Sequence, residues 1–286
     1  FSDIIGQTHV VKTLKNAIKN DNISHAYLFT GPRGTGKTTM ARLLAKAVNC
    51  QDDTSAEPCN QCEACESINK GNAVDLIEID AASHRGIDEI RQLREGIKFS
   101  PNQLKYKVYI IDESHQLTKG AANALLKTLE EAPGHAIFIL ATTEPQKMIS
   151  TIISRCQRFD FRKLNLAEII SKLEKILEAE DIESDKRSLE IIATAAGGSF
   201  RDAESLLDQV LTFTEEKLEE EDVKNLLGLV ETQYIFKFVD LLINSERLRA
   251  IKYLEKMYTE GVNLEEFHSS LLEYLSLVFD NNLRIL

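Results

Sequence analysis

The chain has 286 residues, of which 43% are apolar and 28% are charged, values that exclude a fibrous or largely disordered protein and allow two or three domains. No run of about eighteen apolar residues occurs, so we expect no transmembrane helix and no membrane contact. The net charge of −11 is unevenly distributed, with 19 basic and 19 acidic residues in residues 1 to 160 but 15 and 26 in residues 161 to 286. We therefore expect a domain boundary near residue 160, and DNA contacts only before it, because phosphate binding requires surplus cations.

The first predicted elements are a helix over residues 8 to 20 and a buried strand over residues 26 to 30. Apolar residues at helical spacing mark the helix, and a short aromatic-bearing apolar run marks the strand. A second helix is expected over residues 39 to 48. The chain begins with Phe1 rather than methionine, so we expect that its natural N-terminus lies upstream and leave targeting open.

A glycine-rich loop joins this strand to the second helix, and its residues are Gly31, Pro32, Arg33, Gly34, Thr35, Gly36, Lys37 and Thr38, followed by Thr39. Glycines allow backbone amides to surround an anion, and the following helix directs its positive end at the same anion. In such a loop Lys37 reaches the β- and γ-phosphates of ATP, and the Thr38 hydroxyl ligates Mg²⁺. The alternative, a glycine-rich turn without chemistry, is disfavoured because the full eight-residue pattern stands between a strand and a helix.

Four cysteines follow within sixteen residues: Cys50, Cys59, Cys62 and Cys65. Their spacing suits a tetrahedral structural Zn²⁺ site with no open position. Two disulfides are the alternative, and a nucleotide-hydrolysing loop beside thiols favours the reducing cytoplasm instead. Cys156 stands apart and is interpreted as a small apolar residue.

The next predicted strands carry acidic and hydroxyl side chains at their ends. A strand over residues 75 to 80 and a helix over 88 to 97 precede an apolar strand that ends in Asp112 and Glu113. At the carboxyl end of a parallel sheet, Asp112 is expected to order Mg²⁺ and Glu113 to orient and polarise the attacking water. Without the phosphate loop, the two would be interpreted as an acidic strand end.

Residues 121 to 131 are predicted to form a helix, and residues 136 to 143 a buried strand ending in Thr143, which can lie between the acidic strand end and the γ-phosphate. Residues 157 to 161 form the last predicted strand. Arg85 precedes the helix at 88 to 97 and could hold a phosphate of a nucleic acid, although exposed arginines are more often only solvated. Arg91 is the second candidate for such a contact.

The order of these motifs closely resembles one family over essentially the whole chain. Besides the phosphate loop and the four cysteines, the resemblance rests on Asp-Glu-Ser-His (112 to 115), Leu-Leu-Lys-Thr-Leu-Glu-Glu (125 to 131), Ala-Thr-Thr-Glu-Pro-Gln-Lys (141 to 147) and Ser-Arg-Cys (154 to 156). The combination is similar to the gamma/tau subunits of bacterial DNA polymerase III, the ATPase motors of sliding-clamp loaders. The resemblance implies an AAA+ module with a five-strand parallel sheet, a three-helix lid and a helical collar through which five subunits assemble.

The resemblance also implies residue roles and partners. Thr143 corresponds to sensor 1, Arg155 to the arginine finger that reaches the ATP of a neighbouring subunit, and Arg201 in Gly-Ser-Phe-Arg-Asp-Ala (198 to 203) to the lid residue that senses the γ-phosphate. The implied partners are the delta and delta prime subunits, further gamma/tau copies, the sliding clamp and primer-template DNA. In this family a longer N-terminal segment helps to enclose adenine, and the given sequence starts after it, at Phe1. The remaining candidates for contacts with the base are Ile4, Ile5 and Gly6.

The second part of the chain is predicted to be helical. Helices over residues 166 to 180, 185 to 196 and 201 to 213 suit a lid, and longer amphipathic segments over 233 to 243, 246 to 260 and 264 to 283 suit a collar. Their apolar stripe consists of Phe236, Val239, Leu241, Leu271, Leu275 and Val278. We predict three domains: residues 1–160 with the cysteine insertion at about 50–66, residues 161–228, and residues 229–286.

These observations predict an ATP hydrolase of a clamp loader with no polymerase site of its own. A branch-migration or initiator AAA+ ATPase is one alternative, but it is expected to lack the cysteine insertion and Ser-Arg-Cys. A non-hydrolysing clamp-loader scaffold is another, but Lys37, Thr38, Asp112 and Glu113 are all intact. Arg155 could instead only pair with a nearby carboxylate.

Overall fold

The computed structural model describes the chain except residues 2–3, 53, 214–216, 229–231, 260 and 284–286, and the side chains of 225, 232–233, 266, 273 and 277–283. The chain forms two compact units. One comprises Phe1–Lys172 with Ala196–Asp202, and the other comprises Leu173–Ala195 with Ala203–Leu286. Within the described residues, no helix is both long and apolar enough to cross a membrane. The predicted three-domain division stays a prediction.

The first unit contains a five-stranded sheet built from β1 (Ala26–Thr30), β2 (Leu76–Asp80), β3 (Lys107–Asp112), β4 (Ala136–Thr142) and β5 (Gln157–Asp160). The strand order is β2-β3-β4-β1-β5, and every pair is parallel, which confirms the predicted sheet. All residues of β1 and β4 are buried, as expected for central parallel strands covered on both faces. The carboxyl ends of all five strands therefore lie along the same edge of the sheet.

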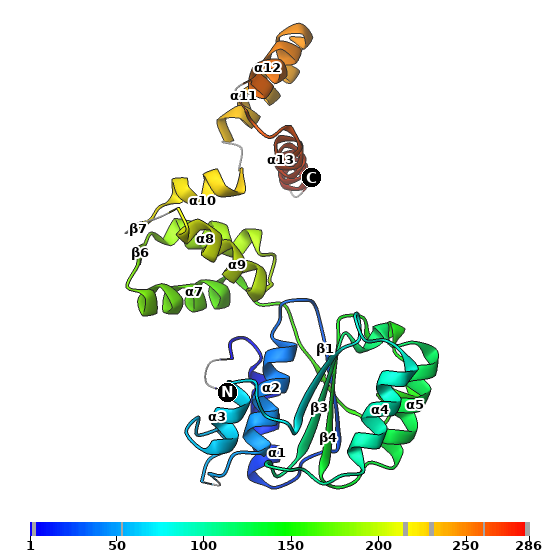
Figure 1. Cartoon of the computed structure of the whole chain (residues 1–286). Helices are drawn as coiled ribbons and strands as arrows, with labels where there is room; N and C mark the ends of the chain where they lie inside the picture. Colours follow the sequence, from blue (N-terminus) through cyan, green and yellow to red (C-terminus); the bar gives the residue numbers. More distant parts are fainter. Residues whose placement is uncertain (2–3, 53, 214–216, 229–231, 260, 284–286) are drawn as a thin grey trace. The chain divides into compact units, whose positions relative to one another are not determined.

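Helices cover both faces of this sheet (Figure 1). α1 (Thr8–Lys19), α2 (Lys37–Val48) and α3 (Glu63–Asn69) lie on one face, and α4 (Ile87–Ile97) and α5 (Lys119–Glu130) lie on the other. Phe29 and Met40 belong to the core on the α2 side, whereas Tyr109, Leu125 and Phe138 belong to the core on the α4 and α5 side. The side-chain period of two sends alternate residues of each strand into these two cores.

Two short helices of this unit were not predicted, α3 and α6 (Ser150–Ile153). The Cys62 side chain caps α3 by accepting a hydrogen bond from the Cys65 amide, so that helix depends on the arrangement of the cysteines. α6 has only four residues, too few to give a helical period. Two 3₁₀ turns, η1 (Ser114–Gln116) and η2 (Pro145–Lys147), follow β3 and β4.

The remaining elements are helical apart from one small strand pair. α7 (Leu166–Glu180), α8 (Lys186–Ala195) and α9 (Phe200–Leu211) lie within two residues of their predicted ranges. α10 (Glu220–Leu227) and the parallel two-residue strands β6 (Glu183–Ser184) and β7 (Lys217–Leu218) were not predicted. Each of these two strands has only two residues, too few to show an alternation of apolar and polar residues. Only the pairing with the other strand therefore identifies them.

Three helices end the chain: α11 (Thr232–Ile243), α12 (Arg247–Thr259) and α13 (Leu264–Leu283). Their own core contains Ile235, Phe238, Met257 and Phe267. Of the predicted apolar stripe, Phe236 is exposed, while Val239, Leu241, Leu271 and Leu275 are partly buried, and the Val278 side chain lies outside the described residues. The three helices were therefore predicted correctly, but the predicted apolar stripe coincides only partly with their buried face.

Candidate active site and cysteine cluster

The phosphate loop leaves the end of β1 and enters α2 at Lys37. Gly34 has a φ of 72° and Gly36 has a φ of 90°, conformations that L side chains rarely adopt. A Cβ atom on Gly34 would collide with the Ser199 hydroxyl, so this loop position requires glycine for space as well. The loop thus keeps its backbone open towards the start of α2, as an anion site requires. The Thr35 hydroxyl stabilises the turn by donating to the Pro32 carbonyl oxygen at 2.9 Å.

Lys37 is buried, and its ammonium donates to the carbonyl oxygens of Gly31 at 2.9 Å and Pro32 at 2.8 Å. Burial lowers the pKa of Lys37, while the carboxylates of Glu113 and Asp112 oppose this effect and the nearby Arg201 adds to it. The Lys37 charge therefore lies among the acidic strand end, the loop and the start of α9. The Lys37 ammonium thus donates to two loop carbonyl oxygens, and it can donate to phosphate oxygens in their place.

Sheet topology brings Asp112 next to the phosphate loop. β3 ends at Asp112, and β4 alone separates β3 from β1. The Thr38 hydroxyl donates to Asp112 Oδ2 at 2.6 Å, although the two residues are 74 positions apart. A hydroxyl and a carboxylate at this distance are suitable oxygen ligands for Mg²⁺, which prefers such donors and retains several waters. The donor set therefore fits the predicted Mg²⁺.

Glu113 lies one residue beyond β3 and has a φ of 45°, unusual for a residue with a side chain. The Thr143 hydroxyl, which follows β4, donates to Glu113 Oε2 at 3.0 Å. Both predicted residues are thus brought together at the edge that also carries Asp112. Such strained residues concentrate at functional sites, where surrounding contacts maintain them.

Arg201 belongs to the segment Ala196–Asp202, which is part of the first unit. The Phe200 amide donates to the Gly34 carbonyl oxygen at 3.0 Å, and the Leu164 amide donates to the Gly198 carbonyl oxygen at 3.1 Å. Arg201 itself is exposed in the first turn of α9. The predicted γ-phosphate sensor is therefore close to the loop in this chain.

Arg155 has different surroundings. One guanidinium nitrogen lies 2.6 Å from Glu130 Oε1, and the other donates to the Thr151 carbonyl oxygen at 2.9 Å. The only other hydrogen bond of this side chain with a described residue is to the Ser154 hydroxyl. None of these partners belongs to the phosphate loop, so within one chain Arg155 is paired with a carboxylate. Among the candidate DNA contacts, Arg91 pairs with Asp88 at 3.0 Å.

The four cysteines come together as predicted. Their sulfurs all lie within 4.8 Å of one another, and the cysteines are free thiols, contrary to the alternative of two disulfides. Backbone amides of Cys59, Cys62 and Cys65 donate to the sulfurs of Cys50, Cys59 and Cys62 respectively. Desolvation acts to raise the pKa of the Cys62 thiol, but hydrogen bonds from the Gln51 and Cys65 amides outweigh it and lower the pKa to about 6.

This donor set fits Zn²⁺, which four thiolates bind in a closed tetrahedral site. Cys156 is not part of the cluster. Its side chain packs against the α4 and α5 core, and burial raises its pKa to about 12, as expected for a small apolar residue.

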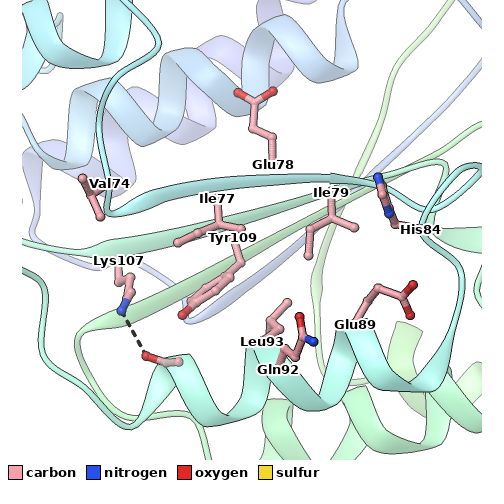
Figure 2. A pocket seen from close by; sticks show the side chains of 11 residues that line it. Val74, Ile77, Glu78, Ile79, His84, Glu89, Gln92, Leu93, Lys107 and Tyr109 are labelled. Atoms are coloured by element: carbon pink, nitrogen blue, oxygen red, sulfur yellow. Dashed lines mark hydrogen bonds between the residues drawn. The ribbon is translucent and has the colours of Figure 1, made fainter.

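A separate groove of about 480 Å³ lies between β2 and α4 (Figure 2). Figure 2 shows Ile77, Ile79 and Tyr109 of the sheet facing Leu93 and Gln92 of the helix, and the Lys107 ammonium donates to the Gly96 carbonyl oxygen at 3.0 Å. None of the predicted site residues lines this groove. It is therefore distinct from the edge that carries Asp112 and Glu113.

His115 was given no role from the sequence, although it completes Asp-Glu-Ser-His. The structure buries it beside Glu113, Thr142 and Glu144. The adjacency of β3 and β4 supplies the contacts with Thr142 and Glu144, because four residues of sequence do not show which strand lies next to them.

Three family models match consecutive parts of the chain. Residues 6–165 match "DNA polymerase III, delta subunit", residues 168–216 match "DNA polymerase III clamp loader subunit, ATPase lid domain", and residues 218–283 match "DNA polymerase III subunits gamma and tau domain III". Solved structures of the Thermotoga maritima RuvB Holliday junction branch migration motor align with a TM-score of 0.58 at 19% identity, covering 91% of this chain and 83% of that one. At this identity the likeness shows the AAA+ fold alone.

Relatives in sequence are considerably closer. DNA polymerase III subunit tau of Bacillus subtilis is 52% identical over 91% of this chain, and that of Escherichia coli is 41% identical over 97%. The chain spans 46% and 43% of the lengths of these two proteins. DNA polymerase III subunit gamma of Buchnera aphidicola is 42% identical over 96% of this chain and 76% of its own length. The chain therefore belongs to the DNA polymerase III gamma/tau family.

Proposed function

We propose that this chain is an ATPase motor subunit of a bacterial clamp loader. It uses ATP binding and hydrolysis to open the ring-shaped sliding clamp and load it onto primed DNA, as part of the DNA polymerase III holoenzyme. The observation that carries the proposal is the convergence of Lys37, Thr38, Asp112, Glu113 and Thr143 at one sheet edge. Family membership favours a clamp loader over a branch-migration motor, and the intact acidic and lysine side chains favour a hydrolysing subunit over a scaffold.

ATP binding is assigned to the phosphate loop and its flanks, namely Gly31, Pro32, Arg33, Gly34, Thr35, Gly36, Lys37, Thr38 and Thr39. The backbone amides and the start of α2 attract the phosphates, and Lys37 exchanges its loop carbonyls for the β- and γ-phosphate oxygens. Thr38 and Asp112 would hold Mg²⁺, which neutralises charge on those oxygens when bound.

Hydrolysis is assigned to Glu113 with its neighbours. Glu113 accepts a proton from water as the water oxygen bonds to the γ-phosphorus, and the bond to the bridging oxygen breaks with its electron pair leaving on ADP. Thr143 holds the Glu113 carboxylate through the 3.0 Å hydrogen bond. Arg201 of the same chain and Arg155 of a neighbouring subunit stabilise charge on the γ-phosphate.

The proposed partners are delta, delta prime and further gamma/tau copies, together with the sliding clamp and primer-template DNA. Contact between subunits is supported by large apolar side chains that α11 and α12 expose, including Leu242, Ile243, Leu248, Ile251 and Tyr258. DNA contact is assigned to the part before residue 160, with Arg85 and Arg91 tracking phosphates without reading sequence. The predicted domains 1–160, 161–228 and 229–286 serve as nucleotide-binding, lid and collar domains.

The proposal is tested by ATP turnover of the chain alone and in mixtures. We expect slow turnover by the isolated chain, because the site then lacks an arginine from a neighbour, and a large increase with partner subunits, clamp and primed DNA. Mixtures without clamp serve as the control. Assembly without any clamp- or DNA-stimulated turnover would contradict the motor function.

The cysteine cluster is proposed to hold one structural Zn²⁺. We expect a metal-to-chain ratio near one by atomic emission, because four thiolates close the coordination shell. Cys62→Ser is expected to loosen residues 50–66 while the ATP site stays formed, since the two cores that hold α2 and β3 include none of the four cysteines. Cys156→Ser, outside the cluster, is the control and should retain the metal. Disulfides without metal under non-reducing mass spectrometry would overturn the assignment.

A further inference from the structure

His115 lies between the proposed catalytic carboxylate and a second carboxylate. Its side chain is only 4% exposed, and its Nδ1 lies 3.0 Å from the Thr142 hydroxyl and 3.4 Å from Glu113 Oε2. On the other side of the ring, Nε2 lies 3.4 Å from Glu144 Oε1 and 3.2 Å from the Gln116 amide nitrogen. The imidazole therefore has one nitrogen on the Glu113 side and one on the Glu144 side.

The surroundings indicate which nitrogen carries a proton. If Nδ1 carries it, that N–H donates to the Thr142 hydroxyl oxygen and lies beside the Glu113 carboxylate, and Nε2 accepts from the Gln116 amide. In the other neutral tautomer, the Nδ1 lone pair would face the Glu113 carboxylate. In the first, the Nε2 lone pair faces Glu144 Oε1 at the same 3.4 Å, so the Gln116 amide beside Nε2 decides between them. Thr142 Oγ1 also accepts from the Glu144 amide at 3.1 Å, which fixes the hydroxyl beside the ring. We therefore infer an N–H at Nδ1.

The Glu113 carboxylate is contacted on one oxygen. Its Oε2 accepts the Thr143 hydroxyl at 3.0 Å and faces His115 Nδ1, and the described residues make no other hydrogen bond or ion pair with this side chain. The positive φ of Glu113 is a strained backbone conformation for a residue with a side chain, and surrounding contacts maintain it. The Thr143 hydrogen bond and the His115 contact both lie on Oε2, and no described residue pairs with Oε1, which leaves Oε1 for a water molecule.

We propose that His115 is a positioning residue for Glu113 in ATP hydrolysis. Its imidazole, fixed by the hydrogen bond between Nδ1 and Thr142, lies against Oε2 beside the Thr143 hydroxyl, so that Oε1 faces the attacking water and takes its proton. His115 does not touch ATP and does not transfer the proton. The inference rests on the proposed role of Glu113 as the catalytic base.

Glu144 supplies a competing explanation for the buried ring. Lys147 binds Glu144 at 2.7 Å, and its hydrogen bond is the main reason why the Glu144 pKa is lowered; the nearby His115 has a smaller effect. A purely structural histidine would tie η2 to η1 through Glu144, with no bearing on Glu113. The two explanations differ in which ring nitrogen is needed.

Two substitutions test the roles of the two ring nitrogens of His115 separately. The amide of His115→Asn occupies approximately the place of Nδ1, whereas the amide of His115→Gln reaches approximately the place of Nε2. In the assembled complex with clamp and primed DNA, we expect His115→Asn to retain kcat within a few-fold. We expect His115→Gln to lose about tenfold to a hundredfold in kcat, because the Glu113 carboxylate loses a polar neighbour that orients it, with nucleotide Kd unchanged.

His135→Gln is the matched control, because His135 follows α5, contacts the Ile97 carbonyl oxygen and makes no contact with Glu113. Melting temperatures of all variants report folding. Wild-type kcat in a folded His115→Gln, or equal loss in both variants, overturns the positioning role. Glu113→Gln measured alongside distinguishes the two proposals: if it loses turnover while His115→Gln does not, only this inference fails, and if it retains turnover, the proposed base is wrong.

Discussion

Glu113→Gln is expected to abolish most ATP turnover of the assembled complex while ATP still binds. Loss of a positioned general base costs about 10² to 10⁴ in rate, and glutamine has nearly the same shape but cannot accept the proton from water. Nucleotide affinity should remain close to that of the parent chain, because the phosphates are held by the loop rather than by Glu113. Single-turnover kinetics and equilibrium binding of a fluorescent ATP analogue measure the two quantities separately.

Matched variants make this result specific. Glu131→Gln, an exposed residue at the end of α5, should leave turnover unchanged. Lys37→Ala should instead weaken binding by about tenfold to a hundredfold, because charged hydrogen bonds to phosphate are lost. Lys46→Ala, near the other end of α2, should not weaken it. Normal turnover by a folded Glu113→Gln would remove this residue from the catalytic role.

Arg155→Ala is expected to lower clamp- and DNA-stimulated turnover by about 10³ to 10⁵, the contribution of an arginine finger supplied by a neighbour. Nucleotide affinity of the lone chain should hardly change, because within one chain Arg155 contacts Glu130 and Thr151. Arg158→Ala is a suitable control, since Arg158 is similarly exposed and pairs with Asp160 in its own strand. Steady-state turnover of the assembled complex and nucleotide binding by the isolated chain provide the measurements.

A mixing experiment distinguishes a shared site from a local ion pair. Chains with Arg155→Ala and chains with Lys37→Ala are combined in one assembly, which creates some interfaces with an intact arginine and an intact phosphate loop. We expect partial recovery of turnover at those interfaces. If sedimentation verifies assembly but no mixture recovers activity, Arg155 serves only its pairing with Glu130.

Local patterns were sufficient for most elements and for the chemistry carried within one segment. The run from β1 through the phosphate loop to α2 has its turn residues, its apolar strand and its helix formers in consecutive positions, so its conformation follows from local preferences. The cysteine cluster was predictable for the same reason, because spacing within a short insertion limits where the thiols can go. α3, α6 and the strand pair β6 and β7 escaped prediction because they are too short to show a period.

The sequence alone determined the residue types at each strand end, the phosphate loop and the thiol set, and its resemblance to a known family implied the five-strand parallel sheet. Only the tertiary structure decided their distances: Thr38 lies beside Asp112, Thr143 beside Glu113, and the Ser199 hydroxyl against Gly34. These contacts depend on the strand order β2-β3-β4-β1-β5 and on long-range packing, neither of which leaves a local period in the chain. The packing of His115 against Thr142 and Glu144 became visible for the same reason, because β4 brings these two residues to the end of β3.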